Sequence, residues 1–416
     1  MPPLRLVWAA LALGGLAACV TAPPPAKAPS RPGPAAPNQA APQAPSLKLE
    51  PVQFSHLPGW ESAELGPALR AFQRQCEAWA RLAPETPIAR NGAPYGGSIG
   101  QWASACAGAT GTSPENARGF FQANFVPQRV ISQNGQAKLT AYYEPAIQAR
   151  RSPEPGFSEP LLYRPTDMVQ IDVAAFAQIT GNEALSDGPR RLTGQIRDGR
   201  VLPYPERAAI ARAAYSSIAW ANPVDVYNLQ VQGSGRLVFP DGSQVRAAFA
   251  AQNGYKWRSA LGAARDQGRL AAYGGGGWAA FRAYLDANPG EIRPVLDADP
   301  SYVFFTEEAI PDPAAGPRGA AGVPLTAGGS LAVDPAFHPY GIPIFAALEG
   351  LAFFPRLLIA QDTGGAIRRG PLRGDVFMGS GAEAGAAAEK LNADNPRLFV
   401  LLPKPQVLAQ IAPSPR

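Results

Sequence analysis

The sequence predicts a mainly β protein with helical decoration, an α+β fold, and three observations lead to this class. From Ala137 onward, short runs of alternating apolar and polar residues are separated by glycine and proline turns, which is the pattern of strands. Before that point, Leu57 to Gln128 carries apolar residues mostly at helical spacing. Strands and long helices do not alternate regularly, so a parallel βαβ fold is not indicated. A chain of 416 residues is long enough for two or three domains.

The first residues have the layout of a secretory leader. Arg5 precedes the apolar run Leu6 to Leu13, which is too short to span a bilayer as a permanent helix. The segment ends with LAAC, Leu16 to Cys19, which is similar to the lipobox of bacterial lipoproteins and implies cleavage before Cys19 and its lipidation. An ordinary cleaved signal with an incidental cysteine is the alternative. We therefore predict a signal peptide over residues 1–18.

A spacer is expected next. Thr21 to Ser46 is rich in proline and alanine and has almost no large apolar side chains. Such a segment buries too little surface to offset its ordering entropy, so a disordered tether is predicted. We place the lipidated cysteine and this tether over residues 19–56.

The folded body is expected to begin with helices. Glu64 to Leu82 has helical periodicity, and Ser113 followed by Pro-Glu-Asn is a helix-start pattern. Cys76 and Cys106 both lie in this region. In an oxidising compartment they would form a disulfide, and two buried free thiols are the alternative.

Strands and two further helical segments follow. Pro240 to Ser243 reads Pro-Asp-Gly-Ser, a hairpin turn. Trp257 to Gln267 and Gly277 to Ala287 return to helical spacing. The expected strands before them are LTAYYEPAIQAR, PLLYRP, MVQIDV, VYNLQVQG and RLVFPDGSQVRAAFA, and a further set of short strands runs to Leu402.

Composition excludes several kinds of chemistry. The net charge of +5 comes without a dense run of lysine or arginine, so nucleic acid is not an expected partner. The two histidines, His56 and His338, have no metal-ligand spacing, and we expect neither a metal nor a cofactor. No GxSxG elbow accompanies them. Carboxylate chemistry is what remains.

Three aspartates stand out near the C-terminus. They are Asp334 in LAVDPAFHPYGIPIF, Asp362 in AQDTGGAI and Asp375 in RGDVFMGSG. Asp362 and Asp375 stand at strand ends beside glycine turns, where a rigid scaffold can present a carboxylate to a ligand. Asp334 precedes a proline, which favours a turn-capping role. The Asp-Thr-Gly at Asp362 is also the local signature of aspartic proteases, but those need two such aspartates and the chain has one.

These aspartates belong to a series of motifs that resembles the MltA family of membrane-bound lytic transglycosylases. The family calls its C-terminal part the 3D domain after three aspartates. Four upstream segments match further family motifs in the same order, so that the resemblance covers residues 57–404: LTAYYEP (139–145), NLQVQGSGRL (228–237), NGYKWRSALG (253–262) and DPSYVFF (299–305). Ala141 replaces a more usual glycine, and the loop before Asp375 is slightly expanded.

The resemblance implies a fold of two barrels. Residues 57–145 and 300–404, from the two ends of the chain, would build a double-psi β-barrel domain. Residues 146–299 would form a smaller inserted β-barrel domain, with a glycan-binding groove between the two, and residues 405–416 would be a tail.

The resemblance also implies an activity. Lytic transglycosylases cut the β-1,4 bond between N-acetylmuramic acid and N-acetylglucosamine of peptidoglycan without water, leaving a 1,6-anhydro end. The expected partners are peptidoglycan strands and, through Cys19, the membrane; the expected location is the periplasmic face of the outer membrane. Protein partners stay unidentified, a cell-wall synthesis or division complex being one candidate. The alternative is a lipoprotein that binds peptidoglycan without cleaving it.

The residue roles follow from the same resemblance. Asp375 would be the single acid and base, and Asp362 would support it. The upstream motifs would line the groove, and one member of each adjacent pair would instead face the core because strand side chains alternate. The candidate substrate-binding residues are Tyr142, Tyr143, Glu144, Gln230, Gln232, Ser234, Arg236 and Arg258.

Overall fold

The computed structural model describes residues 45–89, 92–134, 137–185, 191–211, 215–348, 350, 353–367 and 370–404. The predicted signal peptide, the lipidation site Cys19 and the whole predicted tail (405–416) therefore lie outside the described residues, as does most of the tether. No helix within the described ranges has the length and apolar character needed to cross a bilayer. The mixed α+β class predicted from the sequence is confirmed.

The folded body begins earlier than the sequence predicts. Strand β1 (Lys48–Pro51) pairs antiparallel with β2 (Phe125–Ile131). A 3-10 helix, η1 (Phe54–His56), follows, and the Phe54 ring lies 4.7 Å from the ring of Trp60. The predicted tether end at residue 56 is therefore wrong. Leu49 and Phe54 pack against the apolar core, whereas the Pro/Ala-rich composition that predicts a tether ends at Ser46.

The predicted N-terminal helices are present. The principal ones are α1 (Gly66–Trp79), α2 (Ala103–Ala109) and α3 (Ala117–Asn124), with η2 (Trp60–Ser62), η3 (Ile99–Trp102) and η4 (Pro114–Asn116) between them. Cys76 of α1 and Cys106 of α2 are joined by a disulfide, with their Cα atoms 5.4 Å apart. The predicted disulfide between these two cysteines is thus confirmed.

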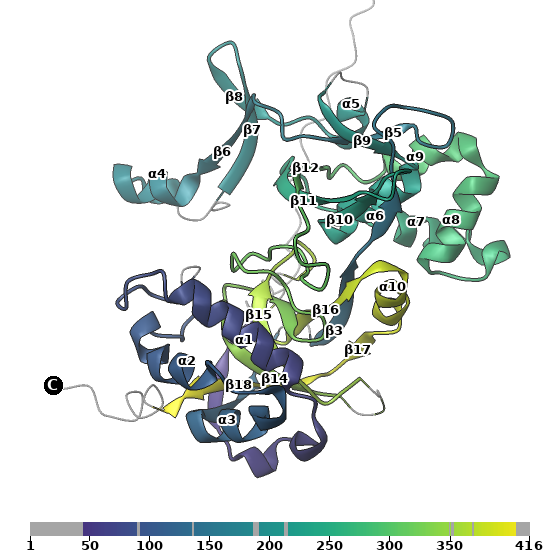
Figure 1. Cartoon of the computed structure of the whole chain (residues 1–416). Coiled ribbons are helices and arrows are strands. Elements are labelled where there is room, and N and C mark those ends of the chain that lie inside the picture. The colour runs from purple at the N-terminus through teal and green to yellow at the C-terminus, as the bar shows by residue number, and fades with distance from the viewer. Residues whose placement is uncertain are drawn as a thin grey trace, which may run out of the picture. The chain divides into compact units, whose positions relative to one another are not determined.

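One nine-stranded mixed sheet combines strands from both ends of the chain (Figure 1). Two of its neighbouring pairs are parallel, β13 with β15 and β16 with β3. Within the described ranges the sheet runs from β1 at one edge to β17 at the other without closing. Its order is β1, β2, β18 (Arg397–Pro403), β14 (Pro343–Ala347), β15 (Arg356–Asp362), β13 (Ser330–Val333), β16 (Arg373–Ser380), β3 (Lys138–Glu144) and β17 (Asn392–Asp394).

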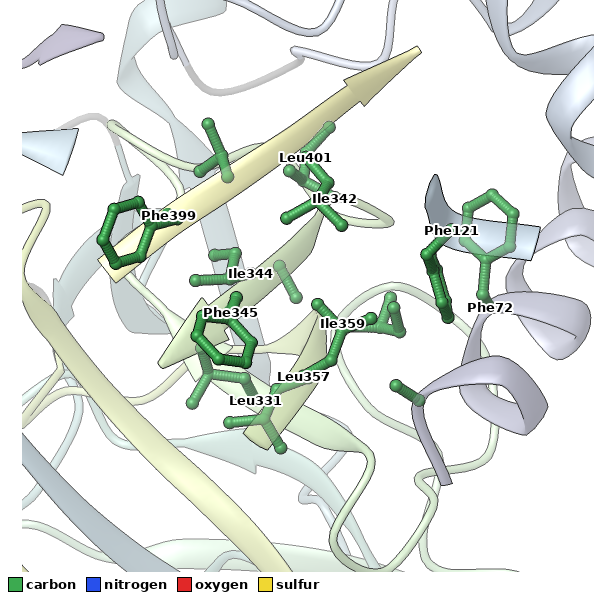
Figure 2. Packing of buried hydrophobic residues seen from close by; sticks show 14 of the residues in the cluster. Phe72, Phe121, Leu331, Ile342, Ile344, Phe345, Leu357, Ile359, Phe399 and Leu401 are labelled. Atoms are coloured by element: carbon green, nitrogen blue, oxygen red, sulfur yellow. The ribbon is translucent and has the colours of Figure 1, made fainter. Parts of the chain in front are cut away.

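The largest apolar core joins this sheet to the N-terminal helices. Figure 2 shows Phe72 of α1 and Phe121 of α3 beside Ile359 and other side chains of the sheet. Strand β14 is buried along its whole length, as is β15 up to its last residue. Because β15 is packed on both faces, only the Asp362 end of this strand remains open to a ligand.

The middle of the chain forms smaller sheets. A four-stranded sheet has the order β12 (Val303–Glu308), β11 (Gln244–Gln252), β10 (Gly235–Val238) and β4 (Ala146–Gln148). Two more sheets pair β5 (Glu159–Leu162) with β9 (Ser217–Ala221), and β6 (Met168–Asp172) with β7 (Arg191–Arg197) and β8 (Arg200–Pro203). The helices here are α4 (Val173–Thr180), η5 (Glu183–Leu185), α5 (Arg207–Ile210), α6 (Pro223–Gln232), α7 (Ala260–Asp266), η6 (Ala271–Tyr273), α8 (Trp278–Ala287), η7 (Pro289–Glu291) and α9 (Ile292–Leu296). The last helix, α10 (Gly381–Glu389), follows β16.

Local turn and helix-capping signals account for one confirmed prediction and one wrong prediction. The predicted hairpin turn lies between β10 and β11, where Gly242 has φ +82° and Asp241 accepts the Ser243 amide. The strand prediction for VYNLQVQG, by contrast, is wrong, since this segment lies in the helix α6. Asn222 caps its start through the Val224 amide, and Pro223 occupies the first turn, a start signal that outweighs the apolar alternation.

Candidate active site

Four residues form one row across four adjacent strands. Thr140 on β3 is paired with Asp375 on β16, Asp375 with Ala332 on β13, and Ala332 with Asp362 at the end of β15. Directly opposite residues on neighbouring strands point to the same side of a sheet. The two aspartates therefore share a face, with only the small side chain of Ala332 between their strands.

Asp375 is partly buried and carries a perturbed carboxyl group. The Thr140 hydroxyl donates to its Oδ1 at 2.6 Å. Burial raises the pKa of Asp375 to about 6, against the opposing effects of the Thr140 hydrogen bond and the Arg373 charge, while the nearby charge of Asp362 raises the pKa further. A carboxyl group in this range can both give and take a proton near neutral pH.

Asp362 is held as a hydrogen-bond acceptor. The Tyr142 hydroxyl donates to Oδ2 at 2.8 Å, and the backbone amide of Ala320 donates to Oδ1 at 3.0 Å. Burial raises the pKa of Asp362, and these two donors and the Thr363 amide oppose that rise. The pKa of Tyr142 is raised well above its ordinary value, first by burial and then by the Asp362 charge, so its phenol keeps its proton and stays a donor.

Arg373 completes the site. Its guanidinium is buried and donates to the Thr140 hydroxyl oxygen at 2.8 Å and to the backbone carbonyl of Lys138 at 3.3 Å. It also contacts the Gly374 carbonyl. The sequence analysis named Asp375 and Asp362 as candidates and Tyr142 as a substrate contact only, and it did not name Thr140 or Arg373. Strand alternation was the available signal, since Thr140 and Tyr142 are two residues apart and share a face.

Asp334 lies apart from this row and has a structural role, as the turn interpretation predicts. It is buried, and its Oδ1 accepts the Ala336 amide at 3.1 Å. Its Oδ2 accepts the Gly370 amide at 3.1 Å. His338 in the same turn contacts the Pro371 carbonyl through Nε2 at 2.6 Å, and burial lowers the pKa of His338 to about 4. The turn thus fixes residues 370–371 just before β16.

Two predicted glycan contacts are wrong, because their charged groups already satisfy one another inside the protein. Glu144 has no exposed surface. Its carboxylate accepts from Arg236 Nε at 2.9 Å, Arg246 Nε at 2.5 Å and Ser380 Oγ at 2.5 Å. Arg236 is buried and also donates to the Pro313 carbonyl at 2.8 Å. Sequence analysis could not identify Arg246 because this partner lies 102 residues from Glu144 along the chain and outside the motifs that carry the resemblance.

The QVQGSG motif holds three more predicted substrate contacts, of which two are buried and one is partly exposed. Gln230 is buried in α6, with its Oε1 accepting from Arg207, so the predicted sugar contact is wrong. Ser234 is buried too, which leaves little surface for a ligand. Gln232 is partly exposed, and its Oε1 accepts the Tyr143 amide at 3.2 Å. For Gln232 a substrate contact stays a prediction.

Tyr143 is packed against its neighbours, whereas the side chain of Arg258 is exposed to solvent. The Tyr143 hydroxyl accepts from Asn228 Nδ2 at 2.9 Å, and its ring lies so close to Gly385 of α10 that a Cβ there would be 2.9 Å away. That packing opposes the predicted contact between Tyr143 and the substrate. Arg258 is exposed, and its backbone amide is fixed by Asp299 Oδ1 at 3.1 Å. Its predicted contact with the substrate stays a prediction.

The site is thus built from carboxylates, a phenol and a guanidinium. Within the part of the chain that the structure describes, no group of three or more His, Cys, Asp or Glu side chains could hold a metal ion. The arrangement can transfer protons at one carboxyl group, Asp375, beside a second one that is committed to accepting hydrogen bonds.

Two family descriptions match this chain. Residues 138–306 match the MltA specific insert domain. Residues 329–395 match the 3D domain. The second match contains all three C-terminal aspartates, and the first contains Thr140 and Tyr142.

Several similar proteins are named as MltA or as membrane-bound lytic murein transglycosylases. A membrane-bound lytic murein transglycosylase from Agrobacterium tumefaciens has a crystal structure that is 32% identical, with a TM-score of 0.70, and the match covers 87% of this chain and 99% of that one. MltA from Neisseria gonorrhoeae is 26% identical with a TM-score of 0.67, over 86% and 91%. Membrane-bound lytic murein transglycosylase A of Escherichia coli K12 is 30% identical over 267 residues, which is 61% of this chain. The match spans 62% of the length of that curated relative.

Proposed function

Because this chain belongs to the MltA family of membrane-bound lytic murein transglycosylases, we propose that it cleaves peptidoglycan without water at Asp375. The bond cut is the β-1,4 link between N-acetylmuramic acid and N-acetylglucosamine. The observation that carries the proposal is the row in which Asp375, with a pKa raised to about 6, faces the acceptor Asp362 across Ala332.

The reaction needs a single proton-transferring group. Protonated Asp375 gives its proton to the glycosidic oxygen, and the C1–O bond breaks with its electron pair going to that oxygen. The C6 hydroxyl of the same muramyl residue then bonds to C1, and its proton passes to the Asp375 carboxylate. The products are a 1,6-anhydro end and a new free hydroxyl, and the enzyme is returned to its starting state.

Asp362 has a different role in this scheme. Since Tyr142 and the Ala320 amide both donate to its carboxylate, it cannot readily act as a second acid. Its negative charge instead raises the pKa of Asp375. A hydrolase would use a second carboxylate as nucleophile or base, so the products released separate the two routes.

Muropeptide analysis tests the proposal. The soluble form lacking residues 1–44 would be incubated with purified sacculi, beside Asp375→Asn and the matched control Asp198→Asn, an exposed aspartate on a positive-φ turn. We expect 1,6-anhydro products from the parent and the control and none from Asp375→Asn. Reducing-end products would show a hydrolase. Binding to sacculi without release by any form would show the peptidoglycan-binding alternative.

Finer features of the architecture remain part of the proposal. The parallel pairs β13–β15 and β16–β3 within an otherwise antiparallel sheet support a double-psi β-barrel over 57–145 and 300–404. The separate sheets between these segments support an inserted β-barrel domain over 146–299. Lipidation at Cys19 would anchor the enzyme to the periplasmic face of the outer membrane, where peptidoglycan is in reach.

A further inference from the structure

We propose that Arg373 and Thr140 act as a positioning pair that reserves Oδ1 of Asp375 as an acceptor, so that the catalytic proton is carried on Oδ2. The inference rests on the proposed function of Asp375 and adds two residues and an oxygen assignment to it. Neither residue is required to touch the glycan.

The first step is the hydrogen count at Thr140. A threonine hydroxyl has one hydrogen to donate and can also accept. Arg373 has only donors, and its Nη2 lies 2.8 Å from Thr140 Oγ1. The hydroxyl therefore accepts from Arg373, and its single hydrogen is free for Asp375 Oδ1, 2.6 Å away.

The second step is that Arg373 cannot turn away. Its side chain is buried, and it donates to the Lys138 carbonyl at 3.3 Å and contacts the Gly374 carbonyl as well. Both carbonyls belong to strands β3 and β16, whose parallel register pairs Arg373 with Lys138 and Asp375 with Thr140. Strand pairing thus fixes the positions of Arg373, Thr140 and Asp375 relative to one another.

The third step is the set of groups that face Asp375 from the neighbouring strands. Arg373 lies on its own strand, Thr140 and Tyr142 lie on β3, and Asp362 lies at the end of β15. Strand β13 contributes Ala332, which does not titrate. Tyr142 donates to Asp362, whereas the Thr140 hydroxyl donates to the Asp375 carboxyl group.

The consequence concerns both proton transfers. With Oδ1 occupied by a donated hydrogen, the proton of neutral Asp375 resides on Oδ2. The same oxygen gives this proton to the glycosidic oxygen and later takes one from the C6 hydroxyl. The Thr140 hydrogen bond also favours the ionised form that exists between the two steps.

The pH dependence of cleavage tests the pair with Thr140→Val, which keeps the shape and removes the hydroxyl. Activity requires protonated Asp375, so the rate falls as pH rises through its pKa. Losing a donated hydrogen bond raises that pKa. We therefore expect the alkaline limb of the pH–rate profile, where the rate falls, to move to higher pH by about 1 unit. Thr140→Ser keeps a hydroxyl and should restore most of the parent profile. Thr306→Val, on an exposed strand position, is the matched control.

A second readout does not depend on cleavage. The carboxyl carbon of Asp375, followed by NMR against pH in the parent and Thr140→Val, should titrate at higher pH in the variant. An unchanged or lower midpoint would overturn the positioning pair. If the parent releases no anhydro products, the proposed function fails, while the NMR midpoint still decides the role of Thr140.

Discussion

At the scale of single residues, two aspartates on one sheet face differ because they receive different hydrogen bonds. Asp375 accepts from one hydroxyl, whereas Asp362 accepts from a phenol and a backbone amide. Equal side chains placed 13 residues apart in the sequence can thus take the roles of proton donor and fixed charge. The proposed roles thus rest on the surroundings of each carboxyl group, which are its burial and then its donors.

Removing the Asp362 charge should move the pH profile opposite to Thr140→Val. Asp362 raises the pKa of Asp375 by charge repulsion, so Asp362→Asn should lower that pKa and shift the alkaline limb down by less than about 1 pH unit. At pH 7 less Asp375 is protonated and cleavage is slower. Rates of anhydro-muropeptide release between pH 4 and 8 measure this. A limb that moves upward would refute the role assigned to Asp362.

Removing the acid itself should stabilise the protein at neutral pH. The folded-state pKa of Asp375, about 6, lies above its unfolded value. Its carboxyl therefore contributes stability at low pH that is lost as pH rises through about 6. Asp375→Asn should raise the free energy of unfolding at pH 7 by up to about 2 kcal/mol and change it little at pH 4. Urea unfolding at both pH values measures this, and equal effects at both would contradict the raised pKa.

At the scale of elements, the two strands that carry the site end on one buried ion cluster. Glu144 is the last residue of β3, and Ser380, paired with it, is the last residue of β16. Arg236 on β10 and Arg246 on β11 bind the same carboxylate. The cluster joins β3 and β16 to the four-stranded sheet, which gives a buried role to residues that the family resemblance assigns to the substrate.

Breaking this cluster should be costly. Glu144→Gln leaves two buried guanidinium groups without their carboxylate, and removing one partner of a buried pair costs about 3–5 kcal/mol. The matched control is Glu154→Gln, which loses a pair with Arg150 at a partly exposed surface position and should cost less than about 1 kcal/mol. Urea denaturation of both variants measures the difference. Equal stability of the two variants would show that Glu144 is not the centre of the cluster.

Local rules predicted those elements whose signals are local. The α1 periodicity, the 240–243 hairpin and the Asp334 turn were all visible in the sequence. Helix α6 was missed because the strand prediction followed the apolar alternation of VYNLQVQG and overlooked the Asn222-Pro223 helix start. The partners of Glu144 and Asp375 lie up to 236 residues away along the chain, and their pairing depends on strand register, which no local pattern specifies.

At the scale of the whole molecule, the chain completes its main sheet only when its last strands arrive. Strand β18 pairs with β2 and β14, and β16 pairs with β3, so residues from both ends meet beside the site. The Thr140–Asp375 contact is therefore possible only in the completed fold. The family resemblance predicted this joining of the two ends, whereas composition and periodicity could not have done so.

The N-terminal boundary of the folded body can be measured by comparing two truncated chains. A chain that begins at Pro45 keeps β1 paired with β2 and keeps Phe54 against Trp60. A chain that begins at Leu57, where the family resemblance begins, loses the strand and this ring contact, and it exposes the edge of β2. We expect the shorter chain to melt a few degrees lower, since about 1–2 kcal/mol of packing is lost, and to aggregate more readily. Calorimetry and light scattering decide between them. Identical melting of the two chains would restore residue 56 as the end of the tether.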